Sequence, residues 1–214
     1  QMCIRDRVEE GIPDKVKMHR DNLTMSYSYQ EEEKWFINVA LRGNFRGNKQ
    51  NTQSTLYPIS NPANSVEMKD YTGSNSKSPS LDIYLQRNLK HNQAIILNTV
   101  GTYIHTYDDR TYEEKKHSDI VTDIYSAIRG KKYSFIGEGI YEKRFTNSKF
   151  STGIRHQQSL TENRYAGTSS AETQMQEAYT STYVEYSCKV KKFNYSLGLQ
   201  GSRSWFNQEG EGYQ

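Results

Sequence analysis

The sequence predicts an all-β protein: an antiparallel transmembrane β-barrel fragment of about eight strands, arranged as four hairpins of a larger barrel. Three observations support this prediction. Apolar and polar residues alternate through most of the chain, which is the pattern of strands with one apolar and one polar face. The expected strands are roughly 8–14 residues long, which suits a bilayer that about 9–11 tilted residues cross. The connectors between them are alternately short and long.

Composition excludes several other classes. The chain has 214 residues, of which 25% are charged and 34% hydrophobic, and its mean hydropathy is −0.94. A disordered chain would need few aromatic residues and a high net charge, whereas this one has 17 tyrosines and a net charge of only +3. With 14 glycines, four prolines and two cysteines, it is neither collagen-like nor a disulfide scaffold. No apolar run reaches the roughly 18–20 residues of a membrane helix.

The first half of the chain contains four expected strands. Residues 23–29 (LTMSYSY) alternate apolar side chains with threonine and serine, and residues 35–41 (WFINVAL) place Trp, Ile, Val and Leu at every second position. Residues 81–89 (LDIYLQRNL) alternate Leu and Ile with Asp and Gln. Residues 96–104 (ILNTVGTYI) alternate less cleanly, and their even positions, with two isoleucines and a valine, are expected to be the apolar side.

The second half contains four more. In residues 133–145 (YSFIGEGIYEKRF) two isoleucines share a parity with glutamate, so the apolar side of this strand is ambiguous. Residues 150–155 (FSTGIR), 184–190 (VEYSCKV) and 193–199 (FNYSLGL) alternate cleanly. Helical periodicity is weak throughout, and its best candidate is the short stretch 170–176.

The lengths of the connectors suggest a membrane barrel. Short turns are expected at 30–34, 90–93, 146–149 and 191–192, and long polar loops at 45–78, 108–132 and 165–175. Outer-membrane barrels keep short turns on the periplasmic side and long loops outside, with aromatic girdles at both interfaces. The expected girdle residues are Trp35, Phe45, Tyr107, Tyr133, Phe145, Phe193 and Trp205.

This order of connectors also predicts the organisation of the chain. Both ends of the chain would then be extracellular, whereas a complete barrel normally has both termini in the periplasm, so we expect a piece of a larger barrel. Residues 1–7 (QMCIRDR) resemble a translated sequencing-adapter scar, with a genuine N-terminus as the alternative. Residues 8–20 are expected to be a lead-in on the extracellular side, residues 21–206 a partial barrel, and residues 207–214 the start of a truncated loop.

Four segments carry a resemblance to a known family. They are 80–89 (SLDIYLQRNL), 133–145 (YSFIGEGIYEKRF), 150–156 (FSTGIRH) and 183–199 (YVEYSCKVKKFNYSLGL). These segments resemble the barrel of the TonB-dependent-receptor-like outer-membrane proteins of Bacteroidetes, over about residues 12–206. The resemblance implies a large barrel in the outer membrane of a Gram-negative bacterium, with an N-terminal plug and a TonB-type energy-coupling partner. The chain itself contains no plug motif and no TonB box.

Two groups of residues are candidates for solute contact. Alternation predicts that five polar residues face the lumen: Arg42, Asp82, Gln86, Arg155 and Glu185. The long polar loop 45–78, with Tyr57 and Tyr71, suits capture of a polar ligand or glycan. The simpler interpretation of both groups is a generically wet wall and a solvated loop.

No catalytic chemistry is expected. The five histidines lack the spacing and cysteine partners of a zinc site, and no nucleophile-elbow, P-loop or dinucleotide motif occurs. We therefore expect no catalytic residue, no metal, no cofactor and no enzyme activity, and no basic stripe suggests nucleic acid. An outer-membrane protease or lipase barrel would need a clustered acid/His or Ser/His set, which the sequence does not show.

The predicted function is that of an outer-membrane receptor or transporter barrel in contact with membrane lipid. It would take up a scarce small solute of the siderophore, vitamin or glycan class. Two alternatives stay open: a passive or structural outer-membrane barrel, and a soluble glycan-binding β-sandwich.

Overall fold

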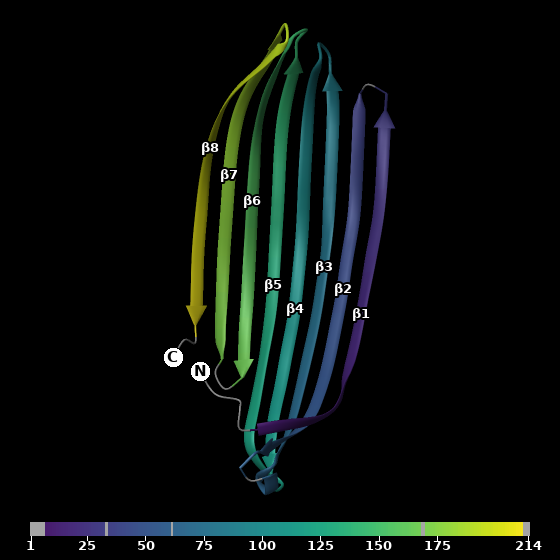
Figure 1. Cartoon of the computed structure of the whole chain (residues 1–214). Helices are drawn as coiled ribbons and strands as arrows, with labels where there is room; N and C mark the ends of the chain where they lie inside the picture. Colours follow the sequence, from purple (N-terminus) through teal and green to yellow (C-terminus); the bar gives the residue numbers. More distant parts are fainter. Residues whose placement is uncertain (1–6, 33, 61, 168–169, 212–214) are drawn as a thin grey trace.

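The computed structural model describes residues 7–32, 34–60, 62–167 and 170–211. They form one antiparallel sheet in which each strand pairs with the next along the chain (Figure 1). The strands are β1 (Arg7–Glu31), β2 (Trp35–Pro58), β3 (Val66–Leu89), β4 (Gln93–Lys116), β5 (Asp119–Arg144), β6 (Ser148–Gly167), β7 (Ala171–Val190) and β8 (Phe193–Glu211), and the 3-10 turn η2 (Pro62–Asn64) lies between β2 and β3. The all-β prediction of eight strands in four hairpins is confirmed.

The strands are much longer than the sequence predicted, at 19 to 26 residues. The prediction of long loops at 45–78, 108–132 and 165–175 is wrong, because most of these residues pair with a neighbouring strand and extend the sheet. The β4–β5 connection is a tight turn at His117 and Ser118, whose φ angles are 51° and 77°. The usual sequence signal of such a turn is Asn-Gly or Asp-Gly. The His-Ser dipeptide is not one of these, so the turn was not predicted from the sequence.

The segments predicted to lie outside the barrel at the two ends of the chain also belong largely to strands. Residues 8–20, the expected lead-in, belong to β1, which bends at an irregularity in register between Ile12 and Lys15. The helical candidate at 170–176 lies almost entirely in β7. The expected terminal loop is strand up to Glu211. Residues 212–214, and all but the last residue of the expected adapter scar, lie outside the described residues.

The register gives the sheet two faces of different chemistry. One carries what we call the apolar belt. Its members are Leu23, Met25, Tyr27, Tyr29, Trp35, Ile37, Val39, Leu41, Phe45, Leu81, Ile83, Leu85, Ile95, Leu97, Tyr103, Tyr133, Phe135, Tyr141, Phe150, Ile154, Leu160, Val184, Tyr186, Val190, Phe193, Tyr195, Leu197, Leu199 and Trp205. The opposite face, the polar wall, carries mainly Ser, Thr, Asn, Gln and charged residues.

The register also settles two uncertain strands. In β5, Phe135 and Tyr141 lie on the belt face, and the isoleucines lie on the polar wall with Glu138. In β4 the expectation was wrong, because the odd positions lie on the belt face and the even positions face the polar wall. On the wall, Ile96 of β4 therefore lies opposite Ile140 of β5, and Val100 lies opposite Ile136.

Nothing in the described residues covers the apolar belt. Among the residues that the structure describes, the buried hydrophobic ones are Ala40 and Ala127, and Leu197 and Leu199 expose 77% and 80% of their surface. The accessible surface is 16131 Å², whereas a compact protein of this mass would expose about 10,000 Å². A soluble β-sandwich would pack a second sheet on this face, but the part of the chain described forms one sheet.

The belt crosses the sheet diagonally. The row of directly paired belt-face residues that starts in β1 runs through Tyr29, Ile37, Leu85, Leu97, Gly139, Ile154, Thr182 and Gly201. We call the end of the sheet with the β2–β3, β4–β5 and β6–β7 connections the long-hairpin side, and the other end the turn side. In β1 the belt residues 23–27 lie on the long-hairpin side of this row, whereas in β8 residues 193–199 lie on its turn side and Trp205 lies on its long-hairpin side. The belt thus shifts by about one residue per strand, which at strand spacings of about 4.8 Å and rises of 3.3 Å corresponds to roughly 35°.

That slope is the tilt of strands in a closed barrel, roughly 35–45°. In β2 the belt runs from Trp35 to Phe45, and ten steps of about 3.4 Å at that tilt rise about 27 Å. The apolar band of an outer-membrane barrel is about 25 Å tall. No helix of the described residues is both long and apolar enough to cross a membrane.

Candidate functional site

The polar wall is the face that offers contacts to a polar solute. All five residues predicted to face a lumen lie on it, because their positions are opposite in parity to the belt. The structure brings only two of them together, Arg42 of β2 and Asp82 of β3, which form an ion pair. That this wall lines a lumen stays a prediction.

The other three have separate surroundings. The Gln86 side chain accepts a hydrogen bond from the Tyr84 hydroxyl at 2.9 Å and donates one to Asn88 at 2.9 Å. Glu185 accepts a hydrogen bond from the Ser196 hydroxyl at 2.7 Å. Arg155 lies directly opposite Glu138 of β5 in the register. The wall therefore presents paired charges and amide groups spread over many strands.

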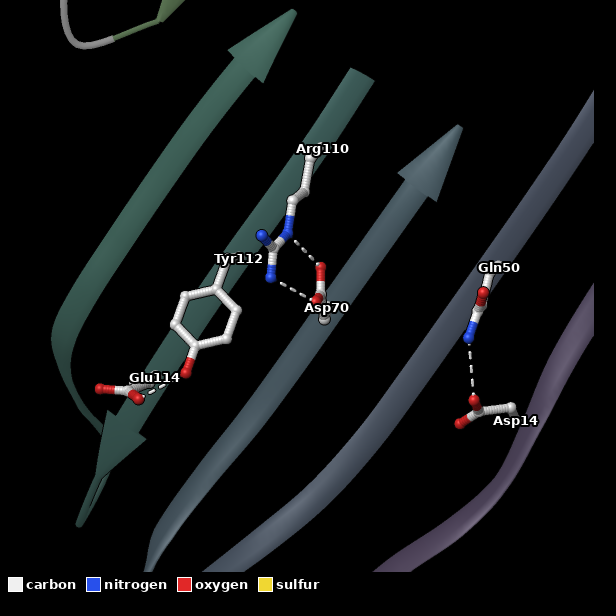
Figure 2. Close-up of polar contacts among 6 residues, drawn as sticks. All are labelled: Asp14, Gln50, Asp70, Arg110, Tyr112 and Glu114. Atoms are coloured by element: carbon white, nitrogen blue, oxygen red, sulfur yellow. Dashed lines mark hydrogen bonds and ion pairs between the residues drawn. The ribbon is translucent and has the colours of Figure 1, made fainter. Parts of the chain in front are cut away.

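A second polar cluster lies on the same wall, beyond the belt towards the long hairpins (Figure 2). The Arg110 guanidinium donates two hydrogen bonds to the Asp70 carboxylate, at 3.0 and 2.7 Å. This two-point geometry is the strong form of an Arg–carboxylate contact. The Tyr112 hydroxyl donates to Glu114 at 2.6 Å, and Glu114 also accepts from Thr122 at 2.9 Å.

Sequence reasoning missed this cluster because it read the segments around it as loops. Its signal was present: Arg110, Tyr112 and Glu114 are alternate residues, as on one face of a strand. Across the wall, Gln50 donates a hydrogen bond to Asp14 at 3.0 Å (Figure 2). A polar ligand near the long hairpins would meet carboxylate, guanidinium and phenol groups on rigid strands.

The two tyrosines predicted in a ligand loop are strand residues. Tyr57 is the second-last residue of β2, and Tyr71 lies in β3 next to Asp70. Both share the parity of the belt, so they are on the opposite face from the Asp70–Arg110 pair. Their role in binding stays a prediction. Among the described residues, no group of three or more His, Cys, Asp or Glu side chains is arranged to hold a metal ion.

The Tyr112 phenol should lose its proton at a higher pH than an ordinary tyrosine. It lies outside the belt, and burial, followed by the hydrogen bond to Glu114, raises its pKa to about 12 from an ordinary value of about 10. The protonated phenol therefore favours the folded state fully below about pH 10, and that contribution is lost as the pH rises through about 12. We expect alkaline titration of tyrosinate absorbance to show a late component that the variant Tyr112→Phe reduces by one phenol.

An internal control is available for that titration. Hydrogen bonding with Tyr107 raises the pKa of Tyr125, so its part of the late absorbance should persist in the variant. An unchanged late amplitude in Tyr112→Phe would contradict the assignment.

Comparison with known proteins adds only distant similarities. No known family and no curated protein matches the chain. Among solved structures, the ferric yersiniabactin uptake receptor FyuA from Yersinia pestis aligns with a TM-score of 0.43 at 9% identity, covering 96% of this chain and 44% of that one. Pseudomonas aeruginosa OccK11 (OpdR) aligns with a TM-score of 0.13 at 6% identity, covering 92% and 96%. The chain spans less than half the length of FyuA, and neither similarity assigns it to a family.

Proposed function

We propose that this chain forms part of the wall of an outer-membrane β-barrel of the receptor or transporter type, in a Gram-negative bacterium. The observation that carries the proposal is the diagonal apolar belt. An exposed apolar surface of this extent suits contact with lipid, and its slope and height suit tilted strands in a bilayer. The open outer edges of β1 and β8 would pair with further strands, because unpaired backbone groups are not tolerated in lipid.

In this proposal the polar wall faces the lumen and serves solute passage. The Arg42–Asp82 pair and the Glu138–Arg155 position lie behind the belt, at the depth of the membrane. The Asp70–Arg110 pair lies beyond it, where a solute arriving from the long-hairpin side would first meet the wall. Polar and charged groups at both depths suit a small polar solute of the siderophore, vitamin or glycan class.

The test is insertion and strand tilt. The full chain is refolded with phospholipid vesicles, and polarised infrared spectroscopy on oriented bilayers measures the angle between the strands and the membrane normal. We expect a tilt of roughly 35–45°. Strands that lie in the membrane plane, or a chain that stays in solution, would contradict the proposal.

Energy coupling needs a separate test. A TonB-type partner is proposed from the family resemblance, and it requires a plug domain. Sequencing the gene's upstream region should reveal a plug and a TonB box. A reading frame in which a signal peptide leads directly into barrel strands would instead favour the passive barrel.

A further inference from the structure

Three neighbouring strands carry a row of basic side chains on the belt face, at the long-hairpin edge of the belt. Lys77 of β3 lies opposite His105 of β4, and His105 lies opposite Lys131 of β5. Both lysines are exposed, and neither forms an ion pair within the part of the chain that the structure describes. The acidic neighbour is Glu162, opposite Lys131 in β6. Lys77 has no acidic residue opposite it, because its register partners are Phe45 and His105, and it lies on the face that we assign to lipid.

An apolar groove lies next to this row, towards the middle of the belt. Its volume is 530 Å³, and most of its lining lies on the belt face, including Leu41, Leu81, Gly101, Tyr103, Tyr133 and Phe135. The groove exists because Gly101 has no side chain there: a Cβ at this position would meet no atom within 4 Å.

Aromatic rings join the groove to the basic row. The Tyr103 and Tyr133 rings are 4.9 Å apart, and the His105 ring lies nearly parallel to that of Tyr103, at 6.5 Å and 9°. Tyr103 is two residues from His105, and Tyr133 two residues from Lys131, so groove and row are separated by about 7 Å along each strand. A single elongated molecule can therefore reach both.

We propose that the row and the groove together form a binding site for a membrane lipid with a phosphate-bearing headgroup. The inference rests on the proposed function, because it takes the belt face to be the lipid-facing one. The lysines would bind the phosphate, since basic residues near a membrane surface attract anionic headgroups. One acyl chain would occupy the groove, whose lining begins two residues from the row and runs across the sheet from Leu41 of β2 to Leu160 of β6. A solute in the lumen would not meet this site, which is on the opposite face from the polar wall.

The experiment measures lipid retained by the full chain after folding into vesicles. The vesicles contain phosphatidylcholine with a minor share of phosphatidic acid, and native mass spectrometry counts the lipids that stay bound after detergent extraction. We expect the unmodified chain to retain phosphatidic acid preferentially, and to lose that preference in high salt. The double variant Lys77→Gln, Lys131→Gln should retain roughly 30-fold less, at about 1 kcal/mol for each basic residue. Gly101→Leu should also release the lipid, because it fills the groove.

Matched variants separate this site from general effects of charge and bulk. Lys90→Gln with Lys192→Gln removes the same charge from exposed positions in the short turns at the other end of the sheet. Gly201→Leu adds the same side chain on the belt face of β8, where the nearest atom to the new Cβ would be Thr182 Oγ1 at 3.9 Å. Both controls should retain phosphatidic acid like the unmodified chain.

Each other outcome overturns the proposal. Equal retention of both lipids by the unmodified chain, or equal losses in the controls, would show that no specific site exists. If inorganic phosphate released the phosphatidic acid and Gly101→Leu did not change its retention, the row would bind phosphate without an acyl chain in the groove. A chain that inserts but shows no preference fails here while the proposed function stands. A chain that does not insert fails the proposed function first.

Discussion

Replacing Val39 by arginine should destabilise the membrane-inserted chain by about 2–4 kcal/mol, whereas the same replacement at Asn38 should be tolerated. Val39 lies in the middle of the apolar belt of β2, directly opposite Tyr27 and Ile83. An arginine on the lipid-facing side near the bilayer middle costs about 2–4 kcal/mol, which is a large part of the 5–15 kcal/mol by which folded proteins are usually stable. The measurement is the free energy of unfolding from vesicles, by denaturant titration.

Asn38→Arg is the matched control, because it is one residue away and points to the other face. Its present amide donates to the Ser28 hydroxyl at 2.7 Å, so the polar wall already accommodates a donor there. Equal destabilisation by the two arginines would contradict the assignment of the faces. A larger cost at Asn38 would reverse it.

Deleting Thr99 from β4 should have a still larger effect than any single charge. Side chains in a strand alternate with a period of two, so removing one residue moves every side chain on one side of the deletion to the other face. Either Ile95 and Leu97 leave the belt, or Tyr103 does, and polar wall residues enter lipid instead. We expect the chain to fail to insert, as measured by protease protection in vesicles.

Deleting Thr99 together with Val100 provides the control. The strand is shortened by two residues, but its parity is kept, so both faces keep their chemistry. We expect the double deletion to insert, with reduced stability from the shifted register. If the single deletion inserted as well as the double one, the division of the sheet into a lipid face and a polar wall would be wrong.

How far the sequence predicts this protein depends on the range of each interaction. The strands at 23–29, 35–41 and 193–199 were identified with the correct apolar side, because alternation is a local property of the chain. The even positions of 96–104 were misjudged, because both faces of β4 carry apolar residues and only the partner strands decide which side joins the belt. The long hairpins were missed because the outer parts of the strands are polar on both faces and show no alternation.

The same reasoning applies to the candidate site. Alternation placed Arg42, Asp82, Gln86, Arg155 and Glu185 on one side of the sheet, which needs only their parity within each strand. It could not reveal that Arg42 pairs with Asp82, or Arg110 with Asp70, since each pair is 40 residues apart and meets through the register. Tyr57 and Tyr71 were grouped by their shared polar segment, yet the structure separates them from the Asp70–Arg110 pair by the thickness of the sheet.

Local sequence order is enough to predict that the chain is all-β, that it forms four hairpins, and that most strands have one apolar and one polar side. These properties follow from side-chain order within a few residues. The register comes from the folded sheet, and with it the diagonal belt, the groove at Gly101 and the row of Lys77, His105 and Lys131. Backbone pairing between strands sets which residues become neighbours, and pairing partners lie too far apart in the chain for local patterns to specify them.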